Sequence, residues 1–324
     1  MRRARCLTLV TLVLLATAAR AEDPRPLALL EAMAGAGQSI HYRGSFTYEH
    51  SNSMESFRVF HWVDDGRAHD RVEALNGPES SLQRLGPGDT CQPLGYRLLQ
   101  TGPTETGEEA SGDDSAPELD RLDNYYQLSL RGEERIAGRP TYTLEVRPRD
   151  LLRYGYILNI DQETGLLLRS LLIDENHGVL ERFQFVELEL EDEADTVRRE
   201  AKSLPGETAS SPECDTRSPK TPSDWMLSWV PPGFVFSGER QLAEDIDMLM
   251  YTDGLASFSV FLQPFSGQIS VEGRAKSGAT SAFMGQLAAG ARDFRVTVVG
   301  EIPVHVAEQL ARGISPRLIP ALQD

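Results

Sequence analysis

The sequence predicts an α+β protein in which a long antiparallel sheet comes first and a smaller α+β unit follows. Residues 141–190 alternate apolar and polar side chains with the period of two that belongs to half-buried strands. Turns that end in Gly165 and Gly178 interrupt this alternation, and a glycine can supply the positive φ that a hairpin needs. A stretch rich in charged residues, Pro and Ser, residues 191–222, then separates the two units.

The first unit is predicted to open with a helix followed by a meander of strands. Leu27, Leu30 and Met33 recur at helical spacing within residues 23–38, and prolines stand at the start, where a missing amide costs least. Alternation then predicts strands over residues 40–49, 54–63 and about 69–75, with turns at 50–53 and 64–66.

Two irregularities are expected within the central sheet. Residues 166–173 are almost continuously apolar, which predicts a strand covered on both faces. The apolar positions shift from Phe183 and Phe185 to Val186 and Leu188, so a β-bulge is predicted near Phe185.

The second unit is predicted to be α+β, with short strands and one closing helix. The strands cover residues 225–230, 234–237, 247–251, 256–263 and 296–299, and the helix covers residues 304–313.

The first 21 residues have the pattern of an export signal. Arg2, Arg3 and Arg5 precede an uncharged apolar run, and residues 19–21 form a small-residue cleavage site. No later apolar run reaches the ~20 residues of a transmembrane helix, so we expect an exported chain without a membrane anchor. The expected division is a signal peptide over residues 1–21, a first domain over 22–192, a linker over 193–221 and a second domain over 222–324.

The chain is strongly acidic. Its formal charge is −17, and loss of the four signal arginines takes it to −21. This charge argues against nucleic acid as a partner and disfavours electrostatic adsorption to an anionic membrane. A generally acidic proteome explains the charge equally well. Residues 100–122 are acidic and small, which predicts an exposed loop; their spacing fits no known calcium loop.

Two cysteines, Cys91 and Cys214, follow the signal in a compartment that permits disulfides. A bridge between them is one interpretation. Two unpaired thiols are the alternative, which the Pro/Ser-rich setting of Cys214 favours.

No motif in the sequence indicates catalysis, a metal site or a cofactor. A nucleophile elbow, a zinc-binding helix motif, a C-x-x-C pair and a P-loop are all missing from the sequence. His61 and His69 flank one predicted hairpin and are close enough in sequence to meet across it, but a structural or solvated histidine is the more common case. We therefore predict a protein that is not an enzyme.

The predicted architecture favours a container instead. A twisted antiparallel sheet with one apolar face curls, and a single short helix leaves part of the concave face uncovered. Such an apolar concavity is typical of a lipid site, although the same side chains also fit a plain core. The side chains predicted to line the cavity are Phe46, Tyr48, Phe57, Val59, Tyr156, Leu158, Leu168 and Leu172.

Several long blocks of the sequence resemble the RseB/MucB family of periplasmic regulators of the sigma-E type envelope-stress response. The blocks are Tyr42–Gly66, Arg147–Asp174, Trp229–Phe234, Met250–Phe261 and Val296–Pro303. Their order matches the family over nearly the whole chain after the signal. Departures lie in the acidic segment 100–122 and at residues 278–284, where an asparagine is expected.

The resemblance implies a fold and a function. The N-terminal domain is expected to be an open antiparallel half-barrel around helices, similar to the lipoprotein carriers LolA and LolB, and the C-terminal domain a smaller α/β unit. The protein is expected in the periplasm, bound to the periplasmic domain of an anti-sigma factor of the RseA or MucA type. It would shield that factor from proteolysis and release it when lipopolysaccharide or lipoprotein acyl chains bind. A lipoprotein or lipid carrier of the LolA type is the alternative.

Contact with the anti-sigma factor is predicted on the second domain. The residues chosen are Asp253, Gly254, Phe258 and Glu301, because this block is sharply patterned without any apparent chemistry. A plain turn at Asp253–Gly254 is the alternative interpretation. The sequence leaves open whether the chain forms a homo-oligomer.

Overall fold

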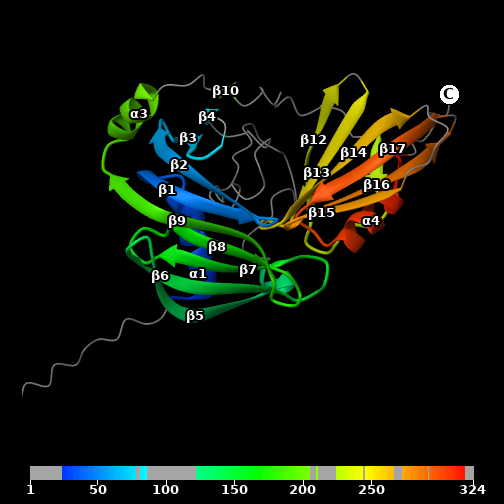
Figure 1. Cartoon of the computed structure of the whole chain (residues 1–324). Helices are drawn as coiled ribbons and strands as arrows, with labels where there is room; N and C mark the ends of the chain where they lie inside the picture. Colours follow the sequence, from blue (N-terminus) through cyan, green and yellow to red (C-terminus); the bar gives the residue numbers. More distant parts are fainter. Residues whose placement is uncertain are drawn as a thin grey trace, which may run out of the picture.

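The computed structural model describes residues 24–77, 81–85, 122–204, 209–210, 224–243, 245–265, 272–290 and 292–317. The predicted signal peptide, Cys91, Cys214 and almost all of the acidic segment lie outside these residues. The described part forms a large N-terminal sheet and a smaller C-terminal sheet, whose strand ends meet near the centre of Figure 1.

The N-terminal sheet has ten strands in the order β10-β4-β3-β2-β1-β9-β8-β7-β6-β5. They are β1 (His41–His50), β2 (Ser53–Asp64), β3 (Arg67–Ala74), β4 (Ser81–Leu85), β5 (Tyr126–Ile136), β6 (Arg139–Pro148), β7 (Gly155–Asp161), β8 (Leu167–Ile173), β9 (Val179–Glu191) and β10 (Ala209–Ser210). Every pairing except the short β10–β4 contact is antiparallel. The edge strands do not pair with each other, so the sheet is open, as predicted.

The hairpin turns explain why neighbouring strands pair in this order. Ser51–Asn52 and Asp65–Gly66 both have positive φ at the two central positions, which is the geometry of a turn that matches strand twist. Gly165 has φ 78, as the sequence predicts. At the β8–β9 turn the prediction was wrong: His177, not Gly178, has the positive φ of 63. Asp174 makes this possible, because its Oδ1 accepts the N–H groups of residues 176 and 178.

The predicted bulge is present in β9. Ser45 pairs with Glu187 and Phe46 pairs with Phe185, so Val186 is the extra residue and is 61% exposed. The bulge allows Phe183 and Phe185 to share one face of the sheet with Leu188 and Leu190.

Helices cover the two faces of this sheet. Helix α1 (Pro26–Ala36) packs Leu29, Leu30 and Met33 against strands β5–β8, on what we call the inner face. Helix α3 (Ala194–Ser203) packs Val197 and Ala201 against Phe60 and Trp62 on the opposite face.

Helix α3 differs from the expected linker over 193–221. Its polar composition led to that expectation, yet Val197 and Ala201 fall one turn apart, so a helix brings both onto the sheet. Val197 is 0% exposed, which makes the helix part of the N-terminal domain.

The C-terminal sheet has six strands in the order β12-β13-β14-β17-β16-β15. They are β12 (Val235–Ala243), β13 (Ile246–Thr252), β14 (Ser257–Phe265), β15 (Gly273–Ser277), β16 (Thr280–Ala289) and β17 (Arg292–Gly300). A separate pair joins β11 (Trp225–Leu227) to β18 (Ile314–Pro316). Strands β15 and β16 were not predicted, because their sequence is dominated by Gly, Ala and Ser, which have weak strand propensity.

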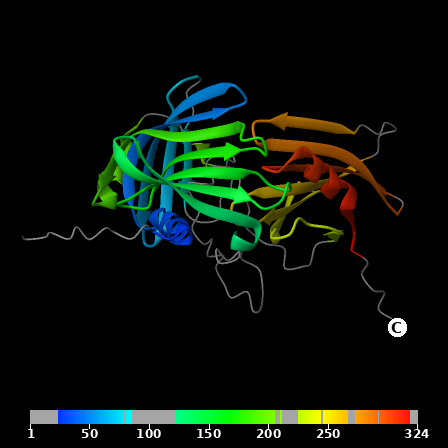
Figure 2. The same ribbon diagram turned by 90° about the horizontal axis from the view of Figure 1, so that it is seen from below.

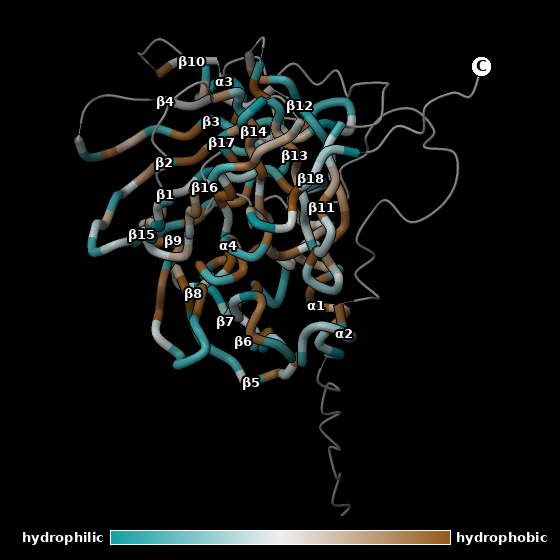
Figure 3. The backbone as a smooth tube through the Cα atoms, turned by 90° about the vertical axis from the view of Figure 1, so that its right-hand side faces the viewer, coloured by the Kyte–Doolittle hydropathy of each residue, from teal (hydrophilic) through white to brown (hydrophobic). Residues whose placement is uncertain are grey.

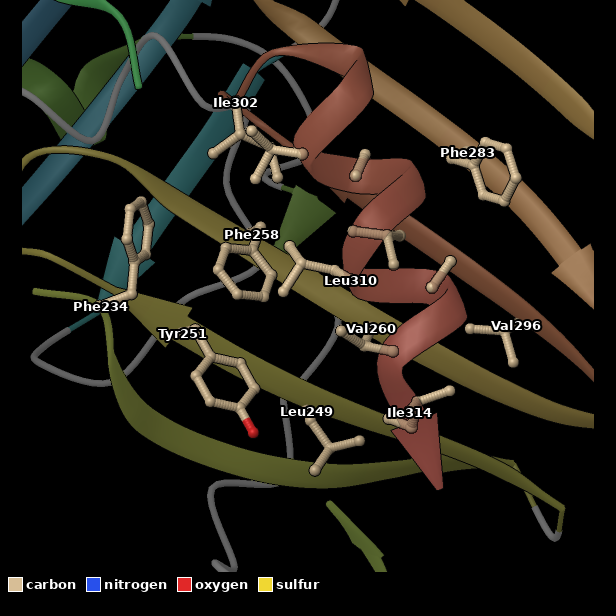
Figure 4. Packing of buried hydrophobic residues seen from close by; sticks show 14 of the residues in the cluster. Phe234, Leu249, Tyr251, Phe258, Val260, Phe283, Val296, Ile302, Leu310 and Ile314 are labelled. Carbon is tan, nitrogen blue, oxygen red and sulfur yellow. The ribbon is translucent and has the colours of Figure 1, made fainter. Parts of the chain in front are cut away.

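Helix α4 (Val304–Gly313) forms where the sequence predicts it and closes the second core. Leu310 lies against Val260, Phe258 and Ile302 on one face of the six-stranded sheet (Figure 4). Hydrophobic residues, brown in Figure 3, concentrate on the strands and on α4, whereas many turns are hydrophilic. Both domains therefore have an α+β fold, as predicted.

No helix in the described residues is long and apolar enough to span a bilayer. The four helices of the described ranges, which include the single turn α2 (Leu122–Tyr125), reach at most 11 residues.

Candidate functional site

A buried ion pair joins the two sheets. Arg153 lies in the loop between β6 and β7, and Asp253 lies in the turn between β13 and β14. Arg153 Nη1 donates to Asp253 Oδ2 at 2.5 Å, and both side chains are 0% exposed. Two opposite charges are retained away from water only when their hydrogen bonds are satisfied, so this contact defines a specific joint between the domains.

The turn that carries Asp253 fixes its carboxylate from the C-terminal side. Oδ1 accepts the N–H groups of Leu255 at 3.0 Å and Ala256 at 2.8 Å. Oδ2 accepts the hydroxyl of Tyr126 at 2.8 Å in addition to the guanidinium of Arg153. Both oxygens are thus held, one by the C-terminal turn and one by the N-terminal domain.

Aromatic rings enclose the guanidinium of Arg153. Its central carbon lies 5.2 Å from the ring centroid of Tyr125, 5.4 Å from that of Tyr126 and 5.1 Å from that of Phe234. Rings at these distances stabilise a cation. Asp150 also accepts from the guanidinium at 3.2 Å, and the carbonyl of Pro232 accepts a short hydrogen bond.

The backbone at Gly233 packs closely against the N-terminal domain beside the joint. Gly233 has φ 90, and a Cβ built on it would lie 2.5 Å from ring atoms of Tyr125. Only glycine meets both requirements, so the loop between β11 and β12 can approach the N-terminal domain.

Burial determines the protonation of the joint. Burial raises the pKa of the Tyr126 hydroxyl well above 10.0, and the charge of Asp253 raises it further, so the hydroxyl remains a donor. Burial also raises the pKa of Asp253, while Arg153, two backbone N–H groups and the Tyr126 hydroxyl oppose that shift by stabilising the carboxylate.

A second connection runs from the inner face to the β15–β16 turn. Glu181 of β9 accepts the backbone N–H of Ala279 at 3.0 Å and the hydroxyl of Tyr48 at 2.6 Å. Gly278, with φ 59, brings this turn onto the carboxylate. The hydroxyls of Ser51 and Ser277 lie 2.8 Å apart beside it. The two domains are therefore linked at two separate places.

All eight side chains of the predicted lipid set lie on the inner face of the N-terminal sheet. Six are buried, and Tyr48 and Phe57 are partly buried. They divide into two clusters: Tyr156, Leu158 and Leu172 pack with α1, and the others pack around Phe183 and Phe185. The shared face agrees with the alternation, and a lipid role for these residues stays a prediction.

The structure gives the predicted partner-binding residues a role within the chain. Asp253 is the joint itself, Phe258 is 2% exposed in the second core, and Glu301 is 5% exposed. Gly254 lies in the Asp253 turn, where its N–H donates to Thr252. Asp253, Phe258 and Glu301 are buried in this arrangement of the domains, and a partner contact through this block stays a prediction. Sequence reasoning could not see this burial, because a burial partner 100 residues away leaves no local pattern.

The two histidines of the β2–β3 hairpin do not meet. His61 Nδ1 lies 2.5 Å from Asp70 Oδ1, and the ring stacks on Tyr42 at 4.8 Å. His69 instead stacks on Trp62 at 5.3 Å. The register pairs Trp62 with His69 and His61 with Asp70, so the two histidines are offset by one position and point to opposite faces.

Within the described residues, no group of three or more His, Cys, Asp or Glu side chains could hold a metal ion.

The fold and the joint define a class: a two-domain α+β protein that presents a composite surface held by buried polar contacts. Family models for the MucB/RseB N-terminal domain and the MucB/RseB C-terminal domain match residues 25–203 and 219–315. The chain belongs to the MucB/RseB family.

Individual relatives cover almost the whole chain. The sigma factor AlgU regulatory protein MucB of Pseudomonas aeruginosa is 33% identical over 89% of this chain and 90% of its own length. The P. aeruginosa MucA/MucB complex contains a chain with TM-score 0.70, 29% identity and coverage of 91% of this chain and 99% of that chain. A structure described as the crystal structure of MucB has TM-score 0.60, 28% identity and coverage of 90% of this chain and 97% of that chain.

Proposed function

We propose that this protein binds the periplasmic region of an anti-sigma factor of the MucA or RseA type and thereby controls an envelope-stress sigma factor. Membership of the MucB/RseB family and the likeness to MucB in its complex with MucA support this function. The protein acts by binding, without a catalytic step, in the periplasm.

The observation that carries the proposal is the buried joint between Arg153 and Asp253. It gives the two domains one defined arrangement, and a composite surface is what a regulator needs to recognise a long partner segment. The likeness to the chain in the MucA/MucB complex has TM-score 0.70, and that to the structure described only as MucB has TM-score 0.60. We infer that the joined arrangement is the one that binds the partner.

Release by lipid is the second part of the proposal. Lipopolysaccharide or lipoprotein acyl chains would occupy the inner face of the N-terminal sheet and favour an arrangement that has lost the partner. To change the anti-sigma factor from mostly bound to mostly free, the lipid must favour the released arrangement over the bound one by several kcal/mol. Each buried methylene of the lipid contributes about 0.8 kcal/mol. Tyr48 is placed to respond, because it lies on this face and bonds Glu181 at the seam.

The function is tested by reconstitution. The purified mature chain is mixed with the periplasmic segment of the anti-sigma factor from the same organism, and the affinity and the rate of cleavage of that segment by its periplasmic protease are measured. Binding and slower cleavage support the proposal, and addition of lipopolysaccharide should reverse both. Absence of binding would overturn the function; binding that lipopolysaccharide leaves unchanged would overturn only the release step.

A lipid or lipoprotein carrier explains the joint less well. A carrier uses the inner face alone and gives no reason to bury an ion pair and a tyrosine hydroxyl against a second domain. Transfer of acyl chains between vesicles by the purified protein, at rates independent of Asp253, would favour the carrier.

A further inference from the structure

A pocket of about 180 Å³ opens at the seam between the two domains. Leu151, Tyr154 and Glu175 line it from the N-terminal sheet, and Lys276 with residues 303–305 lines it from the C-terminal domain. Figure 2 shows the strand ends of the two sheets side by side in this region, next to the start of α4. Because its walls come from both domains, the pocket exists only in the joined arrangement.

The same loop carries the joint and one wall of the pocket. Arg153 reaches Asp253, whereas Leu151 and Tyr154, two residues before and one after, face the pocket. On the other side, Glu301 is buried and Val304, three residues later, lines the pocket. Occupation of the pocket and closure of the joint are therefore physically linked.

One wall of the pocket is apolar and carries a leucine that is exposed to solvent. Leu151 is 68% exposed, the highest value for a large hydrophobic side chain in the described residues. The rings and side chains around it, Tyr154, Pro303 and Val304, are apolar too. An exposed leucine beside a concave apolar wall is typical of a surface that another chain covers.

The volume decides what kind of group fits. Sites for small molecules have volumes of about 300–1,000 Å³, so a pocket of about 180 Å³ is too small for them and for a lipid with several acyl chains. It is comparable to one large apolar side chain, which is how anchor residues of a protein partner are usually buried.

The charged side chains at the rim of the pocket indicate which partner residue would lie next to the bound apolar side chain. The ammonium of Lys276 lies 5.6 Å from the ring centroid of Tyr154, and within the described part of the chain it forms no ion pair. The rim also carries the imidazole of His305 and the carboxylate of Glu175. An ammonium that forms no ion pair within the described residues complements a carboxylate of a partner.

We propose that the seam pocket receives one apolar side chain of the anti-sigma segment, with a neighbouring carboxylate of that segment paired to Lys276. This inference rests on the proposed function and adds the place and chemistry of one contact. Binding at the pocket bridges both domains, so the partner stabilises the joined arrangement and the joined arrangement favours the partner.

The test compares four variants of the mature chain in binding to the purified anti-sigma segment. Leu151→Asp and Lys276→Glu alter the pocket. Val186→Asp and Lys202→Glu introduce the same charges at exposed positions on the bulge and on α3. All four positions are solvent-exposed, and thermal unfolding confirms that each variant folds. The expected result is affinity at least about tenfold lower for both pocket variants and unchanged for both controls.

Each outcome has a fixed meaning. Wild-type affinity for Leu151→Asp overturns the pocket, and wild-type affinity for Lys276→Glu overturns the acidic character of the bound residue. If Leu151→Asp loses binding of lipopolysaccharide but keeps the anti-sigma segment, the pocket belongs to lipid and the inference is wrong. Failure of the wild-type chain itself to bind the segment overturns the proposed function instead, so the two failures are distinguishable.

Discussion

The guanidinium of Arg153 and the carboxylate of Asp253 are 2.5 Å apart, although 100 residues separate them and neither side chain is exposed to solvent. The guanidinium also contacts Asp150 of its own domain, whereas the buried carboxylate of Asp253 finds its cation only across the joint. This dependence couples the stability of the joint to both domains and makes the pair the first target for mutation.

Removal of one partner of this pair should separate the domains. Arg153→Met leaves a buried carboxylate without a cation and should weaken the joint by about 3–5 kcal/mol. Asp253→Asn leaves the guanidinium with Asp150 as its remaining carboxylate, so its loss should be smaller. Fluorescence energy transfer between dyes placed on the two domains measures the fraction joined.

The double variant supplies the control for this prediction. With both charges removed, the loss should be smaller than the sum of the two single losses, because no lone charge stays buried. Additive losses in this cycle would show that Arg153 and Asp253 do not act as a pair.

High pH should open the same joint. Burial raises the pKa of Tyr126 and of Tyr48 above 10.0, and both hydroxyls donate across or beside the seam. Because the folded pKa exceeds the unfolded value, the stabilisation is complete below pH 10 and falls as the pH rises above it. Domain distance followed by energy transfer from pH 8 to 11.5 should therefore increase above pH 10. The Tyr126→Phe, Tyr48→Phe double variant should lose much of this dependence.

The boundary of the N-terminal domain gives a third prediction. A fragment that ends at residue 204 retains α3, whose Val197 is 0% exposed against Phe60 and Trp62. A fragment that ends at residue 192 exposes those aromatic side chains and should be less stable by about 2–4 kcal/mol in urea unfolding. Equal unfolding midpoints for the two fragments would mean that α3 does not stabilise the N-terminal domain and belongs to the linker that its composition predicts.

The sequence predicts regular elements better than contacts between them. Alternation correctly located β1, β2 and the bulge at Val186, and helix α4 formed over residues 304–313 as predicted. These features depend on local patterns of period two or 3.6. Strands β15 and β16 were missed because their small residues become strands only by pairing with each other and with β17.

The candidate site was harder to predict for a related reason. Asp253 was selected from its block, but as a partner contact rather than as the joint. Its partners Tyr126 and Arg153 lie far away in sequence, and neither stood out: an arginine between apolar residues has the pattern of an exposed loop residue. Only the tertiary fold shows that three rings and two carboxylates surround it.

Burial of the inner face leads to a last prediction, which concerns Val59. From the sequence alone, Val59→Asp is expected to abolish the response to lipid while the domain stays folded. In the structure Val59 is 0% exposed within the cluster around Phe46 and Phe185, so a carboxylate there loses its hydration without gaining a partner. We expect the variant to lose at least about 3 kcal/mol of unfolding free energy. Urea unfolding of Val59→Asp and of the size-matched Val59→Thr measures this. An unchanged unfolding midpoint for Val59→Asp would mean that water reaches this position, as an open lipid cavity requires. In that case Tyr48→Phe, which keeps the aromatic ring, is the better variant for testing lipid release.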